Sequence, residues 1–275
     1  MLITRGKDME MHKGLPTFSC LEEKKVVKTI KEMVQCKNLN HPPYERITNY
    51  YDDCTGEIQN QCPLCLKDAE IEHKKQIEKQ YREENIQHCK KCNVEPEYYD
   101  KTLDNYIPQN ESQEIALQAA KDLLDGKIKK LVLLGKYGTG KTMLGSILAK
   151  ESDGRIYTMY EISTMIRQSY TVKADKTELE IVSELASIPG ILVIDEVGRV
   201  TGSNFNNNWQ SYVLDKRHTR GLRTVYLGNG HLRENCPNHG CEKCFENSMD
   251  GDVISRLRQN SRVINILGND YRAKK

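Results

Sequence analysis

Apolar and polar residues alternate in blocks along most of the chain, and this pattern predicts a parallel α/β fold after about residue 95. Short runs rich in apolar and β-branched residues predict strands at 131–134, 155–158, 191–194, 224–227 and 263–266. Segments with helical periodicity predict helices at 111–124, 141–150, 160–170, 176–187, 206–218 and 252–259. Strands that alternate with helices are typical of a parallel sheet flanked by helices.

The region before residue 95 has a different pattern: it is charged, Cys-rich and short of apolar runs. Residues 20–36 predict an amphipathic helix, with an apolar face made by Val26, Val27, Ile30, Met33 and Val34. Residues 66–88 contain neither Gly nor Pro and predict a long, mostly polar helix. We therefore expect a small, mainly helical domain over 1–95 and an α/β domain over 96–275.

Composition narrows the possible classes of protein. The 275 residues carry a net charge of +2. A net charge this small does not by itself indicate a nucleic-acid partner. No stretch approaches the ~20 apolar residues of a membrane span, and the N-terminus lacks the apolar core of an export signal. We therefore expect a cytoplasmic protein. Seven of the ten cysteines lie between Cys20 and Cys92 and three between Cys236 and Cys244. In a reducing compartment such clusters favour zinc over disulfides.

The sequence LVLLGKYGTGKT at 131–142 contains a complete G-x-x-x-x-G-K-T phosphate loop between a predicted strand and a predicted helix. Glycines let the backbone N–H groups turn toward phosphate oxygens, Lys141 supplies a cation for the terminal phosphates, and the Thr142 hydroxyl is a ligand for Mg²⁺. The predicted nucleotide-binding residues are Gly135, Lys136, Gly138, Thr139, Gly140, Lys141 and Thr142.

Further polar residues follow the later strands. Asp195 and Glu196 end the run ILVIDE: the Asp195 carboxylate can hold Mg²⁺ through water, and Glu196 suits a general base that orients the attacking water. Asn229 ends the run TVYLGN and is predicted to help hold that water. Arg256 and Arg258 lie in a predicted helix beyond it, and an arginine supplied by a neighbouring subunit stabilises phosphoryl charge. Lys141, Glu196, Asn229 and Arg256 are the predicted catalytic residues.

Residues 93–275 resemble the AAA+ ATPases, and more narrowly the DnaC/IstB-like helicase loaders. The resemblance is carried by the phosphate loop, KTLDNY (101–106), ILVIDEVG (191–198), LDKRHTRGLRT (214–224) and RLR … GNDYR (256–272). It assigns Asn229 as the sensor and Arg256 as the arginine that acts in trans, and it implies a fold without a separate helical lid. It also implies single-stranded DNA binding at positions that match Arg167, Tyr170, Ser203 and Phe205. Single-stranded DNA binding suits these residue types, because an arginine can pair with phosphate and aromatic rings can stack on bases.

The cysteines predict two zinc sites. Cys62–Cys65 and Cys89–Cys92 are both C-x-x-C pairs, which suit a tetrahedral Zn²⁺. A continuous helix over 66–88 would hold the pairs roughly 35 Å apart at ~1.5 Å per residue, too far for one ion.

Phage-type loaders of the family often carry an N-terminal cluster ending in C-P-x-C. This resemblance implies a first site of Cys62, Cys65, Cys54 and either Cys36 or His41. The second site draws on Cys236, His239, Cys241 and Cys244, an insertion at 236–244; alternatively, Cys241 and Cys244 share an ion with Cys89 and Cys92.

The expected function is that of an ATPase, with ATP, Mg²⁺ and Zn²⁺ as cofactors, that loads a hexameric DnaB-like helicase onto single-stranded DNA. We expect it to self-associate side by side through the ATP site, in a bacterial cytoplasm, whether encoded by a phage or by a cell. Two alternatives are an IstB-like transposition helper and a zinc-dependent nucleic-acid-binding adaptor. The Asp195–Glu196 pair argues against the adaptor, because a passive nucleotide site needs no base.

Overall fold

The computed structural model describes residues 26–51, 57–197, 204–236, 241, 244–247, 251–268 and 270. The chain forms two compact units, Met1–Tyr81 and Arg82–Lys275, which meet within one helix, α1 (Pro63–Lys91). Among the residues that the structure describes, no helix combines the length and the apolar character needed to cross a membrane. Each unit is described by itself.

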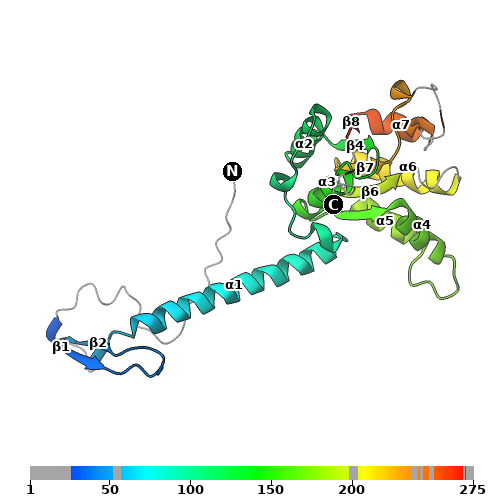
Figure 1. Ribbon diagram of the computed structural model, residues 1–275. Coiled ribbons are helices and arrows are strands. Elements are labelled where there is room, and N and C mark those ends of the chain that lie inside the picture. Colours follow the sequence, from blue (N-terminus) through cyan, green and yellow to red (C-terminus); the bar gives the residue numbers. More distant parts are fainter. Residues whose placement is uncertain are drawn as a thin grey trace. The chain divides into compact units, whose positions relative to one another are not determined.

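The second unit contains a five-stranded parallel sheet with the strand order β5-β6-β7-β4-β8 (Figure 1). Its strands are β4 (Lys130–Gly135), β5 (Arg155–Thr158), β6 (Leu192–Val197), β7 (Thr224–Gly228) and β8 (Ser261–Ile266). All five lie where the sequence pattern predicted strands. The order places β7 between β4 and β6, so the carboxyl ends of these three strands lie next to one another at one edge of the sheet.

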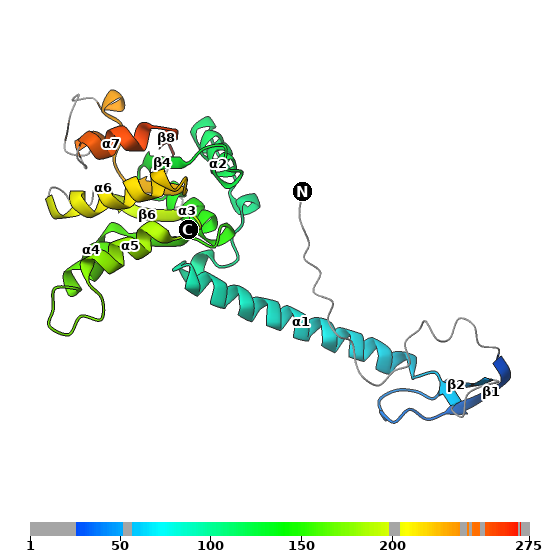
Figure 2. The same ribbon diagram turned by 180° about the vertical axis from the view of Figure 1, so that it is seen from behind.

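Helices cover both faces of this sheet, as Figures 1 and 2 show from opposite sides. They are α2 (Glu111–Leu124), α3 (Lys141–Glu151), α4 (Met159–Gln168), α5 (Glu178–Ser187), α6 (Asn204–Thr219) and α7 (Gly251–Arg258). Every one overlaps a predicted helix. α4 and α5 each begin with a capping box, Thr158 with Glu161 and Thr177 with Glu180, which satisfies backbone N–H groups that a first turn leaves unpaired.

Two apolar clusters, one on each face, form the core of the second unit. Successive residues of a strand point to opposite faces, so Val132 and Leu134 pack with α4, α5, α6 and α7, whereas Leu131 and Leu133 pack with α2 and α3. Burial on both faces explains why the strands read as continuous apolar runs.

A buried arginine on α6 braces one end of this sheet. Arg217 is fully buried. Its guanidinium donates hydrogen bonds to the Thr224 hydroxyl at 3.0 Å and to the carbonyl oxygens of Leu185, Ile188, Gly190 and Arg223 at 2.6–3.2 Å. Burial lowers its pKa to about 10, so the group remains charged at neutral pH. These bonds join the ends of α5 and α6 to the starts of β6 and β7.

The boundary between the units lies earlier than the predicted one near residue 95. Cys89, Cys92 and Val94 account for the difference, because they are buried in the α2/α3 cluster of the second unit. The His88 ring also contacts the Lys150 carbonyl oxygen at 2.9 Å, and the Lys150 ammonium donates to the Tyr99 carbonyl oxygen at 2.9 Å. The last turns of α1 therefore belong to the ATPase-like unit, although their sequence resembles the Cys-rich region.

The first unit is built on an antiparallel sheet, β1-β2-β3, followed by the first part of α1. Its strands are β1 (Val26–Val34), β2 (Tyr44–Tyr51) and β3 (Glu57–Gln59). The helix predicted for residues 20–36 is therefore wrong over 26–34. Valines, Thr29 and Ile30 favour a strand, and the register Val34↔Tyr44 to Thr29↔Asn49 pairs this segment with another β-favouring stretch.

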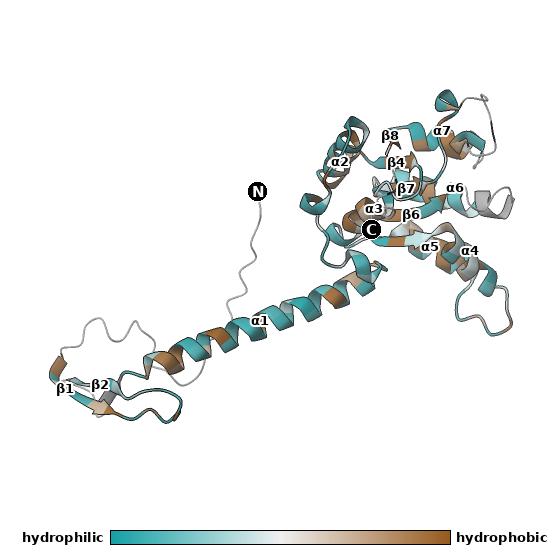
Figure 3. Cartoon of the chain, in the orientation of Figure 1, coloured by the Kyte–Doolittle hydropathy of each residue, from teal (hydrophilic) through white to brown (hydrophobic). Residues whose placement is uncertain are grey.

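α1 confirms the predicted long polar helix and extends it at both ends. Figure 3 shows it as mostly hydrophilic, with separate hydrophobic residues along its length. Leu66, Ile71 and Ile77 of α1 are exposed, as are Val27 and Met33 on β1, which are 65% and 68% accessible. The face predicted to be core is thus largely open to solvent in the described part of the first unit.

Candidate functional site

The phosphate loop connects β4 to α3 in the predicted way. β4 ends at Gly135, and α3 begins at Lys141, directly after Gly140, which adopts a left-handed φ of 90°. A Cβ atom on Gly135 would lie 2.3 Å from the Ile266 carbonyl oxygen of β8, so no other residue fits there without moving the backbone. The loop therefore presents its backbone at the N-terminus of α3, where the helix dipole favours an anion.

Lys141 is almost fully buried within this loop. Its ammonium donates to the carbonyl oxygens of Gly135 at 2.9 Å and Lys136 at 2.7 Å, and to the Thr139 hydroxyl at 3.3 Å. The carbonyl oxygens of the loop thus hold the Lys141 ammonium inside the loop, next to the position where a phosphate would bind.

Thr142 and Asp195 form the oxygen pair that a magnesium ion requires. The Thr142 hydroxyl, in the first turn of α3, donates a hydrogen bond to Asp195 Oδ2, on β6, at 2.8 Å. Burial raises the pKa of the Asp195 carboxyl, opposed by hydrogen bonds from the Glu196 backbone N–H and from Thr142. A cation beside a buried carboxylate offsets that cost. Hydroxyl and carboxylate oxygens are also the ligands that Mg²⁺ prefers, so these residues fit the ion.

Glu196 lies beside Asp195 on the same cavity because β6 is irregular at this point. The β6–β7 register shifts between Ile194 and Val197, and Glu196 has a left-handed φ of 57°. In a regular strand two consecutive side chains would face opposite sides of the sheet. The bulge instead lets both acids line one cavity.

Asn229 follows the last residue of β7 and lines the same cavity of about 660 Å³. Tyr98, Tyr106 and Ile107, from the segment before α2, line it too, together with Gln113 from the first turn of α2. The Tyr106 hydroxyl donates to the Thr139 carbonyl oxygen at 3.4 Å, which fastens this segment to the phosphate loop. These apolar and aromatic side chains suit a nucleobase. The sequence signalled Tyr106 only through the resemblance of KTLDNY (101–106) to a family segment, and it gave no signal for Tyr98 and Ile107.

Arg256 lies outside this cavity. It is on α7, and its Nε atom forms an ion pair with Asp215 Oδ1 of α6 at 3.0 Å. Its backbone carbonyl oxygen accepts a hydrogen bond from the buried Lys130 ammonium. Arg258 pairs with Glu246 at 2.9 Å. The structure therefore does not bring Arg256 to this cavity of its own chain, and its role in trans stays a prediction.

The predicted DNA contacts lie partly within the described residues. Arg167 and Tyr170 are both exposed at the end of α4, and the Tyr170 hydroxyl donates to Glu178. Ser203 lies outside the described residues, and Phe205 is described only as part of α6.

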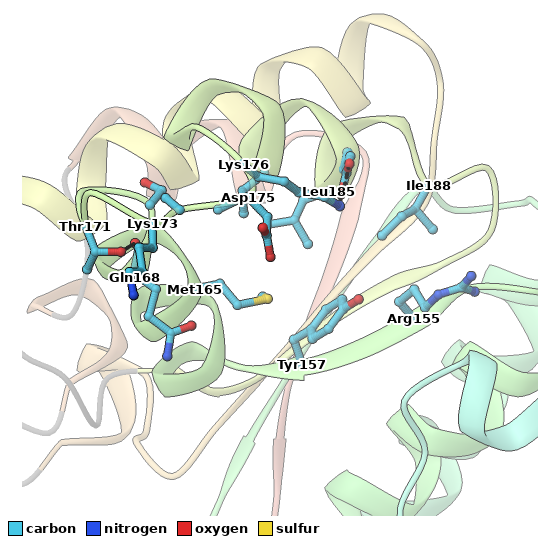
Figure 4. A pocket seen from close by; sticks show the side chains of 14 residues that line it. Arg155, Tyr157, Met165, Gln168, Thr171, Lys173, Asp175, Lys176, Leu185 and Ile188 are labelled. Carbon is cyan, nitrogen blue, oxygen red and sulfur yellow. Dashed lines mark hydrogen bonds and ion pairs between the residues drawn. The ribbon is translucent and has the colours of Figure 1, made fainter.

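A second cavity, of about 640 Å³, lies beside α4 at the β5 edge of the sheet (Figure 4). Arg155 and Tyr157 of β5 form one side of it, and Met165 of α4 points into it from the other. It contains none of the residues predicted to bind the nucleotide, and the candidate nucleotide site remains the cavity beside the phosphate loop.

Among the residues that the structure describes, two groups of Cys and His side chains could each hold a metal ion. The first, here called the hairpin cluster, consists of Cys36 and His41 from the β1–β2 loop and Cys62 and Cys65 from the start of α1. His41 Nδ1 lies 3.3 Å from Cys65 Sγ and 3.7 Å from Cys36 Sγ, and its Nε2 atom contacts Asp68 Oδ2 at 2.9 Å. A carboxylate on the outer ring nitrogen is the usual support for a zinc-bound imidazole.

The hairpin cluster differs in one ligand from the predicted set. Both alternatives for one position, Cys36 and His41, are present together with Cys62 and Cys65. Four ligands are thereby complete, and Cys54 lies outside the described residues.

The second group, here called the sensor-loop cluster, consists of His231, Cys236, Cys241 and Cys244. Sequence analysis missed His231, because a lone histidine just after a strand carries no spacing signal, and proposed His239, which lies outside the described residues. Cys89 and Cys92 belong to neither group. They are buried among apolar residues, and burial raises the pKa of both thiols. Sharing an ion with Cys241 and Cys244 is therefore not the arrangement that the structure shows.

Comparison with known proteins agrees with this geometry. Residues 131–224 match the family described as ATPase family associated with various cellular activities (AAA). The replicative helicase loader DnaC of Escherichia coli strain K12 is 25% identical over 177 residues, which cover 62% of this chain and 69% of that protein.

Solved structures show the same fold. A putative primosome component from Streptococcus pyogenes serotype M3 superimposes with a TM-score of 0.51 at 17% identity, over 66% of this chain and 96% of that one. The replication initiator DnaA bound to AMPPCP and single-stranded DNA gives 0.51 at 18% identity, over 65% of this chain and 52% of that one. The chain thus spans about half the length of that initiator.

The cavity, the strand order and the family match together define an AAA ATPase domain in this chain, with its candidate nucleotide site where β4, β6 and β7 end. Within these ATPases, the chain is a homologue of the DnaC helicase loaders.

Proposed function

We propose that this protein is an ATP-dependent loader of a hexameric replicative helicase onto single-stranded DNA, in the cytoplasm of a bacterium. One observation carries the proposal: Lys141, the Thr142–Asp195 pair, Glu196 and Asn229 meet at one cavity in a domain homologous to a helicase loader. A protein that only stored a nucleotide would have no use for the strained backbone that brings Glu196 to that cavity.

In the proposed reaction, Lys141 contacts the terminal phosphates, and Thr142 and Asp195 hold the magnesium ion. Mg²⁺ bound there neutralises charge on the phosphate oxygens. Glu196 would orient a water for attack on the γ-phosphorus and accept its proton, and Asn229 would hold that water from the neighbouring strand. The bond from the γ-phosphorus to the β–γ bridging oxygen breaks as the new one forms, so ADP and phosphate are the products. Hydrolysis then breaks the contacts that the γ-phosphate makes with the protein, which releases the loader.

Side-by-side assembly would complete this site. Arg256 is placed on α7, outside its own chain's cavity, with its guanidinium oriented by Asp215. We propose that it reaches the γ-phosphate bound by a neighbouring subunit. Arg167 and Tyr170 at the exposed end of α4 would then contact the DNA backbone and bases.

The first unit is the proposed helicase-binding element. It exposes Val27 and Met33 on β1 and Leu66, Ile71 and Ile77 on α1, and such side chains gain most from burial against a partner. Zinc in the hairpin cluster would fix the loop of the β1–β2 hairpin to the start of α1, so that the small sheet keeps its shape.

ATP hydrolysis tests the site. We expect purified protein with Mg²⁺ to hydrolyse ATP, and single-stranded DNA to stimulate it. Lys141→Ala should abolish nucleotide binding, and Glu196→Gln should keep binding while hydrolysis falls by roughly 10²–10⁴-fold, the usual contribution of a general base. Unchanged turnover in both variants would remove the assignment of the site.

Helicase binding tests the function. The full chain should co-purify with the hexameric replicative helicase of its host, and Met33→Asp should weaken the complex. Val172→Asp is the matched control, because it places the same charge on an exposed apolar residue of the second unit. Binding to a transposase and to no helicase would favour the transposition helper instead.

A further inference from the structure

The sensor-loop cluster has the geometry of a metal site. Cys241 Sγ lies 3.3 Å from His231 Nε2 and 3.9 Å from Cys244 Sγ, and Cys244 Sγ lies 3.6 Å from His231 Nε2. Together with Cys236, all four ligand atoms lie within 4.8 Å of one another. Bonds of ~2.3 Å to sulfur and ~2.0 Å to nitrogen around a tetrahedral Zn²⁺ would separate neighbouring ligands by about 3.5–3.8 Å. The observed distances lie close to that value.

The donor set selects the kind of ion. Three thiols and one imidazole are soft ligands that suit Zn²⁺ and not Mg²⁺ or Ca²⁺. All four positions belong to the protein, so no coordination site remains for water or substrate, and the ion would be structural. Disulfides do not explain the cluster, because its cysteines are present as thiols and the Cys241 and Cys244 sulfur atoms are 3.9 Å apart.

Little regular structure holds this part of the chain. Between β7 and α7 the described residues form two single turns, Arg233–Asn235 and Phe245–Asn247, and one isolated bridge between His231 and Cys244. Short turns of this kind contribute little stability by themselves. A metal ion would join them, as it does in small domains that depend on zinc to fold.

The cluster lies between two elements that the ATP reaction uses. His231 follows the sensor Asn229 by two residues. From the cluster side, the Phe245 N–H donates to the His231 carbonyl oxygen at 2.9 Å, and the Phe245 ring packs in the core with Val253 and Leu257 of α7.

A carboxylate adds a second connection to α7. Glu246 Oε2 accepts from the Arg233 N–H at 2.9 Å, and Glu246 Oε1 pairs with Arg258 at 2.9 Å. The next residue, Asn247, donates through Nδ2 to the Cys241 carbonyl oxygen at 2.9 Å. The same short segment thus contacts a ligand of the cluster and the arginine-bearing helix.

We propose that His231, Cys236, Cys241 and Cys244 bind one structural Zn²⁺ that fixes α7, with Arg256, relative to the end of the sensor strand. The role of the ion in positioning Arg256 rests on the proposed function of that residue, whereas the metal site itself does not. Loss of the ion would leave the nucleotide cavity of the same chain intact and displace the arginine meant for the neighbour.

Metal content of the full-length protein tests the site independently of activity. Mass spectrometry under native conditions should find two zinc ions per chain. One ion should remain in Cys241→Ser and in His231→Ala, and none when Cys65→Ser is added. Cys241 is the better ligand to change, because it is only partly buried, so its replacement is tolerated better than that of Cys244.

Two control variants fix the ligand set. His239→Ala and Cys92→Ser should both keep two ions, because neither residue is a ligand in this proposal. Zinc retained in His231→Ala but lost in His239→Ala would overturn the assignment of His231. The site would be overturned if every sensor-loop variant still bound two zinc ions. It would also be overturned if the unmodified protein bound no zinc ion in this cluster. Cobalt added in place of zinc gives a second readout, since a tetrahedral Cys₃His site produces visible absorption that Cys241→Ser should remove.

Nucleotide assays then separate the positioning role from the site. In Cys241→Ser, ATP affinity should stay within about twofold of the unmodified protein, while hydrolysis by the assembled form falls to the level of Arg256→Ala. Hydrolysis that survives loss of the ion would overturn the positioning role and leave the metal site standing. An unmodified protein that binds two zinc ions but hydrolyses no ATP would count against the proposed function and not against the site.

Discussion

Glu196 and Asp195 are neighbours in β6, and both line the nucleotide cavity. The bulge that allows this leaves Glu196 at a φ of 57°, a region that side chains with a Cβ atom avoid at a cost of about 1–2 kcal/mol. Strain of this kind persists where the surrounding fold enforces it, and here the parallel partners on both sides of β6 do so.

Because the strain at Glu196 lies in the backbone, we expect its effect on stability to be separable from the role of the Glu196 carboxylate in hydrolysis. Glu196→Asn should abolish hydrolysis and raise the free energy of unfolding by about 0.5–1 kcal/mol, since Asn tolerates the left-handed region. Glu196→Gln is the matched control: it also removes the base but keeps the strain, so its stability should stay close to that of the unmodified protein. Urea unfolding of both variants measures the difference, and equal stability in the two would show that no strain is stored there.

Arg217 has a purely structural role. Its replacement by Met would remove the guanidinium donor from the carbonyl oxygens of Leu185, Ile188 and Gly190, and each group left unsatisfied costs about 1–3 kcal/mol. The Arg223 carbonyl oxygen would keep the Leu192 N–H as a donor. We expect Arg217→Met to lower the free energy of unfolding by at least about 3 kcal/mol.

The single tryptophan, Trp209, is buried on the same helix and reports this unfolding by fluorescence. Arg220→Met is the control, because Arg220 contacts only an exposed Ser187 hydroxyl among its described hydrogen bonds. Its effect should stay within about 0.5 kcal/mol. A similar small effect at Arg217 would mean that water replaces the lost donors.

Elements with long apolar runs or strong caps could be predicted from sequence, and those with weak local signals could not. The five strands and six helices described in the second unit lie where the pattern placed them. Burial on both faces gives strands a continuous apolar run, and capping residues indicate where helices begin. β1 was mistaken for a helix because its apolar residues fit a helical spacing. The pairing with β2, which decides its conformation, is a contact between distant residues that periodicity does not register.

The metal ligands show the same limit. Cys62 and Cys65 were found from a C-x-x-C spacing, since two thiols in one turn suffice to mark a zinc site. Cys89 and Cys92 have the same spacing but are buried among alanines and leucines. His231 is a ligand candidate without any local partner in sequence, because the fold brings it beside Cys241 and Cys244. Spacing identifies pairs, whereas the complete ligand set requires the fold.

The hairpin cluster offers a prediction about the support of one ligand. Asp68 holds the outer nitrogen of His41, so Asp68→Ala should weaken zinc binding by roughly 10–100-fold, the usual effect of losing such a partner. Zinc transfer to a chromophoric chelator measures this, in a chain that also carries His231→Ala so that the sensor-loop cluster does not contribute. Glu70→Ala, which removes an exposed acid from the same helix, should leave the affinity unchanged. Equal affinity in Asp68→Ala would exclude His41 as an oriented ligand.

Between chains, the position of Arg256 has a consequence that single variants cannot reveal. Its guanidinium is oriented by Asp215 and lies outside its own chain's cavity, so an ATP site and the arginine that completes it would come from different subunits. A chain with Glu196→Gln has a defective site but an intact arginine, and a chain with Arg256→Ala has the reverse. Each should be inactive alone.

Mixing the two variants in equal amounts should restore hydrolysis to roughly a quarter of the unmodified level. That is the fraction of randomly formed head-to-tail contacts in which an intact site faces an intact arginine. A mixture of Lys141→Ala with Glu196→Gln is the control, because both defects lie in the same half of the contact and no combination repairs them. Steady-state hydrolysis in the presence of single-stranded DNA measures both mixtures. Full activity of Arg256→Ala alone, or no recovery when it is mixed with Glu196→Gln, would exclude the proposed role of Arg256, because a group that acts across subunits must be replaceable by the same group on a neighbour.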